Sequence, residues 1–201
     1  MDHEKECRVG ISNIGTVLWG EHSCVFFNSK EELLSLVVPY MKAGLEDNEF
    51  CMWLTGDPLT EKEAFEALEM VLPQAHQYLA RKQLEIMSSR QWYLRSGKFD
   101  GQIVLDKWLS QARHAEAKGF AGIRITGNSN WLQSEEDWTQ FMRYEESVHQ
   151  RIRTERVLAL CAYPTVGFQS KYIQETISAH NSAFRLEGDQ WRRLELSPPL
   201  P

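Results

Sequence analysis

Residues 19–55 have the pattern of a strand, a helix and a second strand, the opening unit of a parallel α/β sheet. In nucleotide-hydrolysing proteins of this architecture, a glycine-rich loop ending in Gly-Lys-Ser/Thr joins the first strand to its helix, and its backbone N–H groups hold the phosphates. Here the joining residues 26–30 are Phe-Phe-Asn-Ser-Lys, without a glycine. The segment predicts an ATPase-like scaffold that has lost its phosphate loop and binds something else.

Composition favours one compact domain, because 201 residues with 42% hydrophobic and 25% charged side chains can bury a substantial core. The net charge of −6 argues against a nucleic-acid partner, which needs a basic surface. No apolar run is long enough for a membrane span, and the charged start MDHEKECR does not resemble a signal peptide. We therefore expect a cytoplasmic protein with no membrane partner. Its cysteines are far apart and are predicted to be free thiols: Cys7, Cys24, Cys51 and Cys161.

Strands and helices alternate along the chain, which predicts a mostly parallel sheet flanked by helices. Strands are expected at 22–27, 50–55, 83–88, 120–126 and 157–163. Helices are expected at 29–46, from residue 60 onward, at 103–118 and at 134–153; three start signals are Ser29-x-x-Glu32, Thr60-x-x-Glu63 and Ser134-x-x-Asp137. A loop is expected at 127–131. Residues 183–187 and 191–196, around Gly188-Asp189, predict a C-terminal antiparallel hairpin.

Two local details complete the expected organisation. Pro39 should kink the first helix, since it removes a hydrogen bond to the preceding turn. Ile103, Trp108, Leu109 and Ala112 are predicted to face inward from the helix at 103–118. The chain divides into a tail at 1–9, one domain at 10–196, and a linker or tail at 197–201.

The sharpest local pattern is His22-x-Cys24, because residues two apart on a strand face the same side. Imidazole and thiolate are ligands for zinc, iron or haem, and Cys161 and His180 could complete such a set. The alternative is structural: the two cysteines are small buried hydrophobes and His22 bonds a backbone carbonyl. The pattern lacks the second close ligand pair of structural zinc sites, and no cofactor is required by the sequence.

A second candidate site lies at the carboxyl ends of the predicted strands, where open parallel sheets bind ligands. Phe27, Asp57, Asn128, Trp131 and Tyr163 fall there and combine aromatic walls with a few polar groups, as a small-molecule pocket requires. Their alternative role is ordinary turn formation.

Trp92 and Tyr93 follow the third strand, where they could form a lid over this pocket or pack as part of a loop. Arg124, inside a predicted buried strand, needs a partner such as Glu145 or Asp57. No Gly-x-Ser-x-Gly, His-Glu-x-x-His or Cys-x-x-Cys motif is present, so the case for an enzyme is thin.

Several motifs together resemble the MEDS domain, a sensory module of methanogens and methylotrophs. They follow one another over about residues 10–196: Gly20-x-His22-x-Cys24-x-Phe26-Phe27, Pro39-Tyr40-x-x-Ala43-Gly44-Leu45, Trp92-Tyr93, Gly122-x-Arg124-x-Thr126-Gly127-Asn128, Trp131, Tyr144-Glu145 and Ala159-Leu160-Cys161-x-Tyr163. The resemblance implies a fold related to RecA and KaiC-like ATPases. It is strongest to the methanogen type, which stands before a sensor histidine kinase in two-component systems.

The resemblance also implies a function: a non-enzymatic input domain that senses a simple hydrocarbon derivative, such as a methylated or halogenated one-carbon compound, and signals to a kinase or regulator. Its ligand residues would be drawn from His22, Cys24, Phe27, Asp57, Trp92, Tyr93, Arg124, Asn128, Trp131, Glu145, Cys161 and Tyr163. A homodimer is compatible with this role. Two alternatives stay open: an enzyme or metal- or haem-dependent redox sensor using His22 and Cys24, and a protein-binding scaffold with a degenerate ATPase fold.

Overall fold

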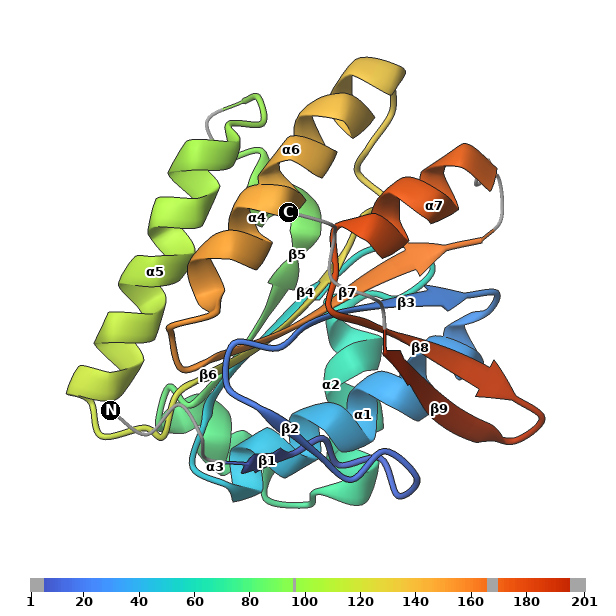
Figure 1. Ribbon diagram of the computed structural model, residues 1–201. Coiled ribbons are helices and arrows are strands. Elements are labelled where there is room, and N and C mark those ends of the chain that lie inside the picture. The colour runs from blue at the N-terminus through green and yellow to red at the C-terminus, as the bar shows by residue number, and fades with distance from the viewer. Residues whose placement is uncertain (1–5, 96, 166–169, 196–201) are drawn as a thin grey trace.

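The computed structural model describes residues 6–95, 97–165 and 170–195 and shows a seven-stranded sheet with helices on both faces (Figure 1). The strand order is β5-β4-β6-β7-β3-β8-β9, and all pairs are parallel except the terminal β8–β9 pair. A separate antiparallel pair, β1–β2, lies outside this sheet. The predicted fold class, a mostly parallel sheet with a C-terminal antiparallel hairpin, is confirmed.

The strands of the described chain are β1 (Glu6–Arg8), β2 (Thr16–Leu18), β3 (His22–Phe27), β4 (Phe50–Thr55), β5 (Leu84–Ser88), β6 (Ile123–Asn128), β7 (Val157–Pro164), β8 (Ser182–Glu187) and β9 (Gln190–Glu195). The helices are α1 (Lys30–Glu46), α2 (Glu61–Val71), α3 (Ala75–Ala80), α4 (Ser89–Tyr93), α5 (Gly101–Ala117), α6 (Glu135–Ile152) and α7 (Ser170–Ser178). The strands predicted at 22–27 and 50–55 have the observed bounds, because each is a short apolar run between clear turn and cap signals.

The predicted helix starts rest on side-chain caps. Thr60 and Ser134 each form a reciprocal capping box with the residue three positions later. Ser29 caps α1 by accepting from the backbone N–H of Glu32, and α1 continues as one helix through Pro39. These contacts satisfy N–H groups that the first turn of a helix leaves without partners.

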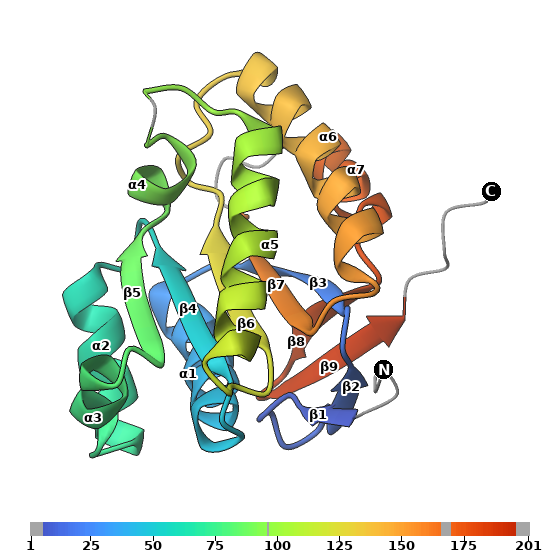
Figure 2. The same ribbon diagram turned by 90° about the vertical axis from the view of Figure 1, so that its left-hand side faces the viewer.

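The helices divide the core into two layers, one on each face of the sheet (Figure 2). On one face, α1, α2 and α3 pack with the β1–β2 pair; on the other, α4, α5, α6 and α7 cover the sheet. Along β3, Val25 and Phe27 point into the first layer, whereas Cys24 and Phe26 point into the second. The period of two along the strand therefore places His22, which is fully buried, on the second face.

Several elements differ from the sequence expectations. Residues 6–8, in the segment expected to be a tail, form β1, and β2, α4 and α7 were not predicted. The single helix expected from residue 60 onward is two helices, α2 and α3. Gly127 and Asn128, expected in a loop, are the last residues of β6. Ile103 was predicted to face inward but is 58% exposed, because the buried face of α5 begins with Val104 and Leu105 and Ile103 lies off that face. Residues 197–201 and Leu196 of the predicted hairpin lie outside the described residues.

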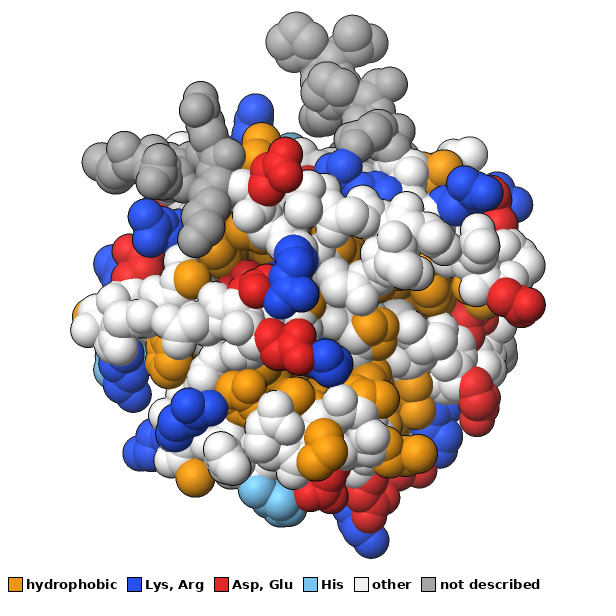
Figure 3. All heavy atoms as spheres, turned by 90° about the horizontal axis from the view of Figure 1, so that it is seen from below, with side chains coloured by type: hydrophobic (Ala, Val, Ile, Leu, Met, Phe, Trp, Pro, Cys, Tyr) orange, Lys and Arg blue, Asp and Glu red, His pale blue; other side chains and the backbone are white. Residues whose placement is uncertain are grey.

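The surface around the lower end of the molecule mixes charged and apolar side chains (Figure 3). Met70 is the most exposed large hydrophobic residue, at 85%. In the described part of the chain, no helix combines the length and the apolar character that crossing a bilayer would require.

Candidate functional site

Four ionisable side chains meet inside the second layer of the core: His22, Glu145, Cys161 and His180. His22 begins β3, Glu145 lies in the middle of α6, Cys161 lies on β7, and His180 lies between α7 and β8. Their ligand atoms all lie within 4.8 Å of one another. His22 Nε2 is 3.0 Å from Glu145 Oε2 and 3.5 Å from Cys161 Sγ, and Glu145 Oε2 is 3.7 Å from Cys161 Sγ. We call this the His-Glu-Cys-His cluster.

The orientation of His180 is fixed by the backbone of α7. Its Nδ1 lies 2.6 Å from the carbonyl oxygen of Thr176; a carbonyl can only accept, so Nδ1 carries the proton and donates. The neutral ring then presents a lone pair on Nε2, which lies 3.7 Å from Glu145 Oε2 and has no hydrogen-bond partner among the described residues. Glu145 Oε1 and His22 Nδ1 also lack a partner of good geometry there.

Burial shifts every member of the cluster towards its uncharged form. It lowers the pKa of His22 and of His180 to about 3, helped by nearby His149 for the first and by the His22 ring for the second. Burial raises the pKa of Glu145, although His180 and the Tyr163 hydroxyl partly oppose it. Burial, with Glu145 beside it, also raises the pKa of the Cys161 thiol. The cluster therefore holds four polar groups in a medium that disfavours charge.

A small cavity adjoins the cluster between α5, α6 and the sheet. Its volume is about 20 Å³, and Glu145 and Cys161 line it together with apolar and aromatic side chains that include Tyr93, Trp108, Tyr144 and Ala159. Trp108 Nε1 donates to the Tyr144 hydroxyl over 2.7 Å, which fixes one wall. A cavity of this size admits about one water-sized molecule without movement of its walls, so it is too small for a porphyrin.

The structure brings together three of the four residues proposed as metal ligands, and Glu145 stands in the place expected for Cys24. Cys24 lies opposite Cys161 in the β3–β7 register and is fully buried, but it is not a member of the cluster. The sequence carried a signal for Glu145. It is a carboxylate on the apolar face of α6, among Phe141, Tyr144 and Val148, where an ionisable side chain needs a partner.

The aromatic residues predicted to wall a pocket at the strand ends are packed into the core, all but Phe27 in the second layer. Trp92 and Tyr93 lie on α4 and are buried rather than open as a lid. Tyr93 stacks on Trp131 with ring centroids 5.0 Å apart, and Tyr163 is fully buried. Phe27 is buried in the opposite layer. Trp92 borders an open pocket that reaches from the end of β5 to α5, and Trp131 borders a second open pocket at the carboxyl ends of β4 and β5.

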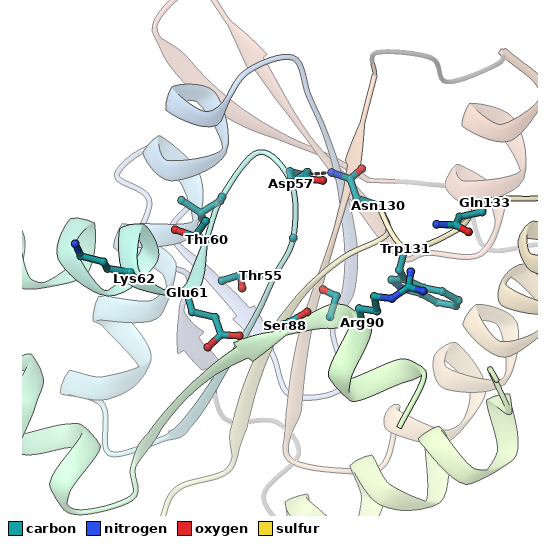
Figure 4. A pocket seen from close by; sticks show the side chains of 13 residues that line it. Thr55, Asp57, Thr60, Glu61, Lys62, Ser88, Arg90, Asn130, Trp131 and Gln133 are labelled. Carbon is teal, nitrogen blue, oxygen red and sulfur yellow. Dashed lines mark hydrogen bonds between the residues drawn. The ribbon is translucent and has the colours of Figure 1, made fainter. Parts of the chain in front are cut away.

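That open pocket, which we call the edge pocket, has a volume of about 540 Å³ and lies beyond the ends of β4 and β5 (Figure 4). Figure 4 shows Glu61 and Lys62 on one side and Arg90 and Trp131 on the other. Asp57 lines it, and its backbone carbonyl accepts from the side-chain amides of Asn128 and Asn130. Asp57 was predicted at this position, whereas Glu61, Lys62 and Arg90 were not, because solvated residues at the start of a helix carry no distinctive pattern.

The turn between β3 and α1 is occupied by the chain's own groups. The Glu32 carboxylate accepts from the backbone N–H of Asn28 at 2.9 Å and from its side-chain amide at 3.0 Å. Ser29 caps the helix, and Lys30 pairs with Glu63 over 2.7 Å. A carboxylate thus lies at the helix N-terminus, where phosphate-binding proteins place the nucleotide phosphates.

Arg124 has a different partner from those predicted. It is fully buried and pairs with Glu49, Nε to Oε2 at 2.5 Å and Nη2 to Oε1 at 3.0 Å, rather than with Glu145 or Asp57. Arg124 points into the first layer, whereas Glu145 lies in the second, so the sheet separates them. Arg124 is therefore a structural group that lies away from both candidate sites.

Comparison with known proteins decides the family. The model described as "MEDS: MEthanogen/methylotroph, DcmR Sensory domain" matches residues 21–181. The chain belongs to this family. The MEDS match begins just before His22 and ends just after His180, so it contains the whole His-Glu-Cys-His cluster.

A curated relative of this MEDS chain is the transcriptional repressor DcmR of Methylorubrum extorquens, 23% identical over 172 residues. The match covers 84% of this chain and 61% of the repressor, so the chain spans less than two thirds of that relative. Together with the family, this similarity supports a sensory role in signalling.

Solved structures similar to the MEDS chain share its fold at low sequence identity. The flagellar accessory protein FlaH of Methanocaldococcus jannaschii has a TM-score of 0.60 at 12% identity, and the KaiC-like protein PH0186 of Pyrococcus horikoshii has 0.59 at 11%. Each match covers 94% of this chain and 85% of the other. The RecA/KaiC-like architecture predicted from the sequence is confirmed.

Proposed function

We propose that this MEDS domain is a ligand-sensing input domain, that it performs no catalysis, and that its ligand is a small, weakly polar molecule bound in the small cavity beside Glu145 and Cys161. The output is a kinase or a transcriptional regulator, either elsewhere in a longer chain or in a separate protein. The observation that supports this ligand position is the cavity itself. It is largely apolar, and it ends on two polar side chains, the buried Glu145 and the partly buried Cys161, that can orient a small ligand.

The size of the cavity restricts the ligand. A volume of about 20 Å³ suits a one-carbon compound only after a small movement of the walls. A ligand of about three heavy atoms gains at most about 1.5 kcal/mol per atom, so its dissociation constant would be about 0.5 mM or weaker. A methylated alcohol, amine or thiol, or a halogenated methane, fits this description, and binding has to be measured at millimolar concentrations.

Binding signals only if the ligand prefers one of two conformations. Gly127 lines the cavity and begins the 127–131 segment, which ends at Trp131 beside the edge pocket. We therefore expect ligand binding to move residues 127–131 and to change the environment of Trp131. Thermal unfolding and tryptophan fluorescence of the wild type, with millimolar one-carbon compounds, test this directly.

A matched pair of β7 variants tests the location. Ala159→Val fills part of the cavity, whereas Ala162→Val makes the same change on the same strand towards the opposite layer. Ala159→Val should abolish the ligand-induced shift in Tm, and Ala162→Val should retain it. Loss of the response in Trp131→Ala but not in Ala159→Val would place the ligand in the edge pocket instead. If no compound stabilises the wild type, the sensing proposal itself is contradicted.

The absence of catalysis has its own test. The sequence lacks a phosphate loop, and the Glu32 carboxylate occupies the turn where phosphates would lie. We expect no turnover of ATP with magnesium by the purified chain. Turnover that is lost in Asp57→Asn would show that the edge pocket is an active site and would overturn this part of the proposal.

A further inference from the structure

We propose that the His-Glu-Cys-His cluster is a tetrahedral binding site for a divalent metal ion, zinc being the best match, with His22, Glu145, Cys161 and His180 as its four ligands. The metal site shares Glu145 and Cys161 with the lining of the cavity, but the proposal does not depend on ligand sensing. It rests on the donor types, their separations, and the unpaired atoms of the cluster.

The separations fit a four-coordinate zinc site. Zinc lies about 2.0–2.3 Å from nitrogen, oxygen and sulfur ligands, so neighbouring ligand atoms of a tetrahedron are about 3.3–3.7 Å apart. Glu145 Oε2 lies 3.0 Å from His22 Nε2, 3.7 Å from His180 Nε2 and 3.7 Å from Cys161 Sγ, and His22 Nε2 lies 3.5 Å from Cys161 Sγ. The widest separation in the cluster is at most 4.8 Å, so closure around an ion needs a movement of about 1 Å.

The hydrogen bond of His180 prepares it for a metal. Histidine ligands commonly donate their second ring N–H to a backbone carbonyl, which fixes the tautomer and directs the free lone pair at the ion. His180 does this through Nδ1 and the carbonyl of Thr176. Its Nε2 lone pair then faces a carboxylate oxygen at 3.7 Å, an arrangement of two acceptors that a cation between them would stabilise.

Charge balance explains why such a site can be buried. One thiolate and one carboxylate neutralise a divalent ion, and two neutral imidazoles add no charge. Burying an isolated charge has a large desolvation cost, whereas a metal centre with no net charge avoids most of that cost. Metal binding would release to solvent the proton of the Cys161 thiol, and also the proton of Glu145 where that carboxyl is protonated. The step changes no oxidation state, so no oxidant or reductant is needed. The mixed nitrogen, sulfur and oxygen set suits zinc better than magnesium or calcium, which prefer oxygen ligands.

The test uses the 201-residue chain, purified under reducing conditions, treated with a chelator and titrated with zinc alone. We expect stoichiometric zinc after gel filtration and a higher Tm with zinc than without it. Cobalt(II) in place of zinc should give the intense visible absorption of tetrahedral coordination and a thiolate-to-cobalt charge-transfer band. A wild-type chain that takes up no stoichiometric zinc, or a weak octahedral cobalt spectrum, overturns the proposal without any variant.

Two cysteine variants provide the matched comparison. Cys161→Ala should lose stoichiometric zinc and the charge-transfer band, and Cys24→Ala should keep both, although each removes one thiol from one of two adjacent strands. His180→Gln should also lose zinc. Circular dichroism of the metal-free variants checks that they are folded. Zinc retained by Cys161→Ala, or lost equally by Cys24→Ala, would contradict this assignment of ligands.

The two proposals can be tested separately, although Glu145 and Cys161 belong to both sites. Ala159→Val, which fills the cavity, leaves all four proposed metal ligands in place and should still bind zinc. A chain that binds zinc but no one-carbon compound would contradict the proposed function alone. A chain that responds to such a compound without binding zinc would contradict the metal site alone.

Discussion

Replacing Glu49 by Gln should strongly destabilise this domain, because it leaves a buried guanidinium without its counter-ion. Arg124 makes two charge-assisted hydrogen bonds to Glu49, and its Nη atoms donate to the backbone carbonyls of Tyr40 at 2.9 Å and Arg8 at 2.8 Å. The guanidinium also lies 4.6 Å from the centroid of the Tyr40 ring. These contacts join β6 to α1 and to the N-terminal β1 strand.

Two independent estimates give the expected loss of stability in Glu49→Gln. Hydrogen bonds to charged groups contribute about 1.5–3 kcal/mol each, so losing two costs about 3–6 kcal/mol. Breaking a buried ion pair by removing one partner typically costs about 3–5 kcal/mol. Burial alone would lower the pKa of Arg124, but Glu49 keeps it above the ordinary value, so the arginine remains charged. We expect Glu49→Gln to reduce the free energy of unfolding by about 3–5 kcal/mol.

Urea denaturation followed by circular dichroism measures this loss. With an m-value of about 2 kcal/mol per M, the midpoint should fall by about 1.5–2.5 M. Arg124→Met should cost a similar amount, because it leaves Glu49 buried and unpaired, and the double variant should cost less than the sum by at least about 2 kcal/mol. Additive single effects, or a loss below about 1 kcal/mol for Glu49→Gln, would refute the argument that an uncompensated charge dominates.

Two further predictions concern a helix position and a surface pair. Gly44→Ala should lower the urea midpoint, because the new Cβ would lie 2.6 Å from Arg124 Nε and 2.8 Å from Cys51 Sγ. This steric clash should outweigh the helix propensity of alanine, which favours the substitution by about 1 kcal/mol. An unchanged or higher midpoint would contradict this. The hydrogen bond from Lys30 lowers the pKa of Glu63 from 4.5 to about 2, so the pair stabilises the fold above pH 4.5 and this contribution is lost as the pH falls towards 2. Glu63→Gln should therefore weaken the pH dependence of the urea midpoint over that range, with only a small effect at pH 7 because both groups are solvated. Identical pH profiles for the wild type and the variant would show that the pair contributes nothing.

The sequence by itself determined the fold class and most helices and strands. Alternating apolar runs and capping signals act over a few residues, so 22–27 and 50–55 could be bounded without any tertiary information. The absence of a phosphate loop could likewise be recognised from a short segment, residues 26–30. The short helix α4 was not predictable in this way, because five residues carry too few repeats of a helical period.

The partners of buried polar groups were decided only by the tertiary structure. Nothing near Arg124 in the sequence distinguishes Glu49 from Glu145, and the choice follows from the face of the sheet to which the arginine points. His22, Cys161 and His180 could be proposed as a set, but Glu145 joined them only because α6 crosses the sheet over β3 and β7. Residues up to 158 positions apart form this cluster. Its geometry depends on how α6 and the segment after α7 pack on the sheet, and local patterns contain no information about that packing.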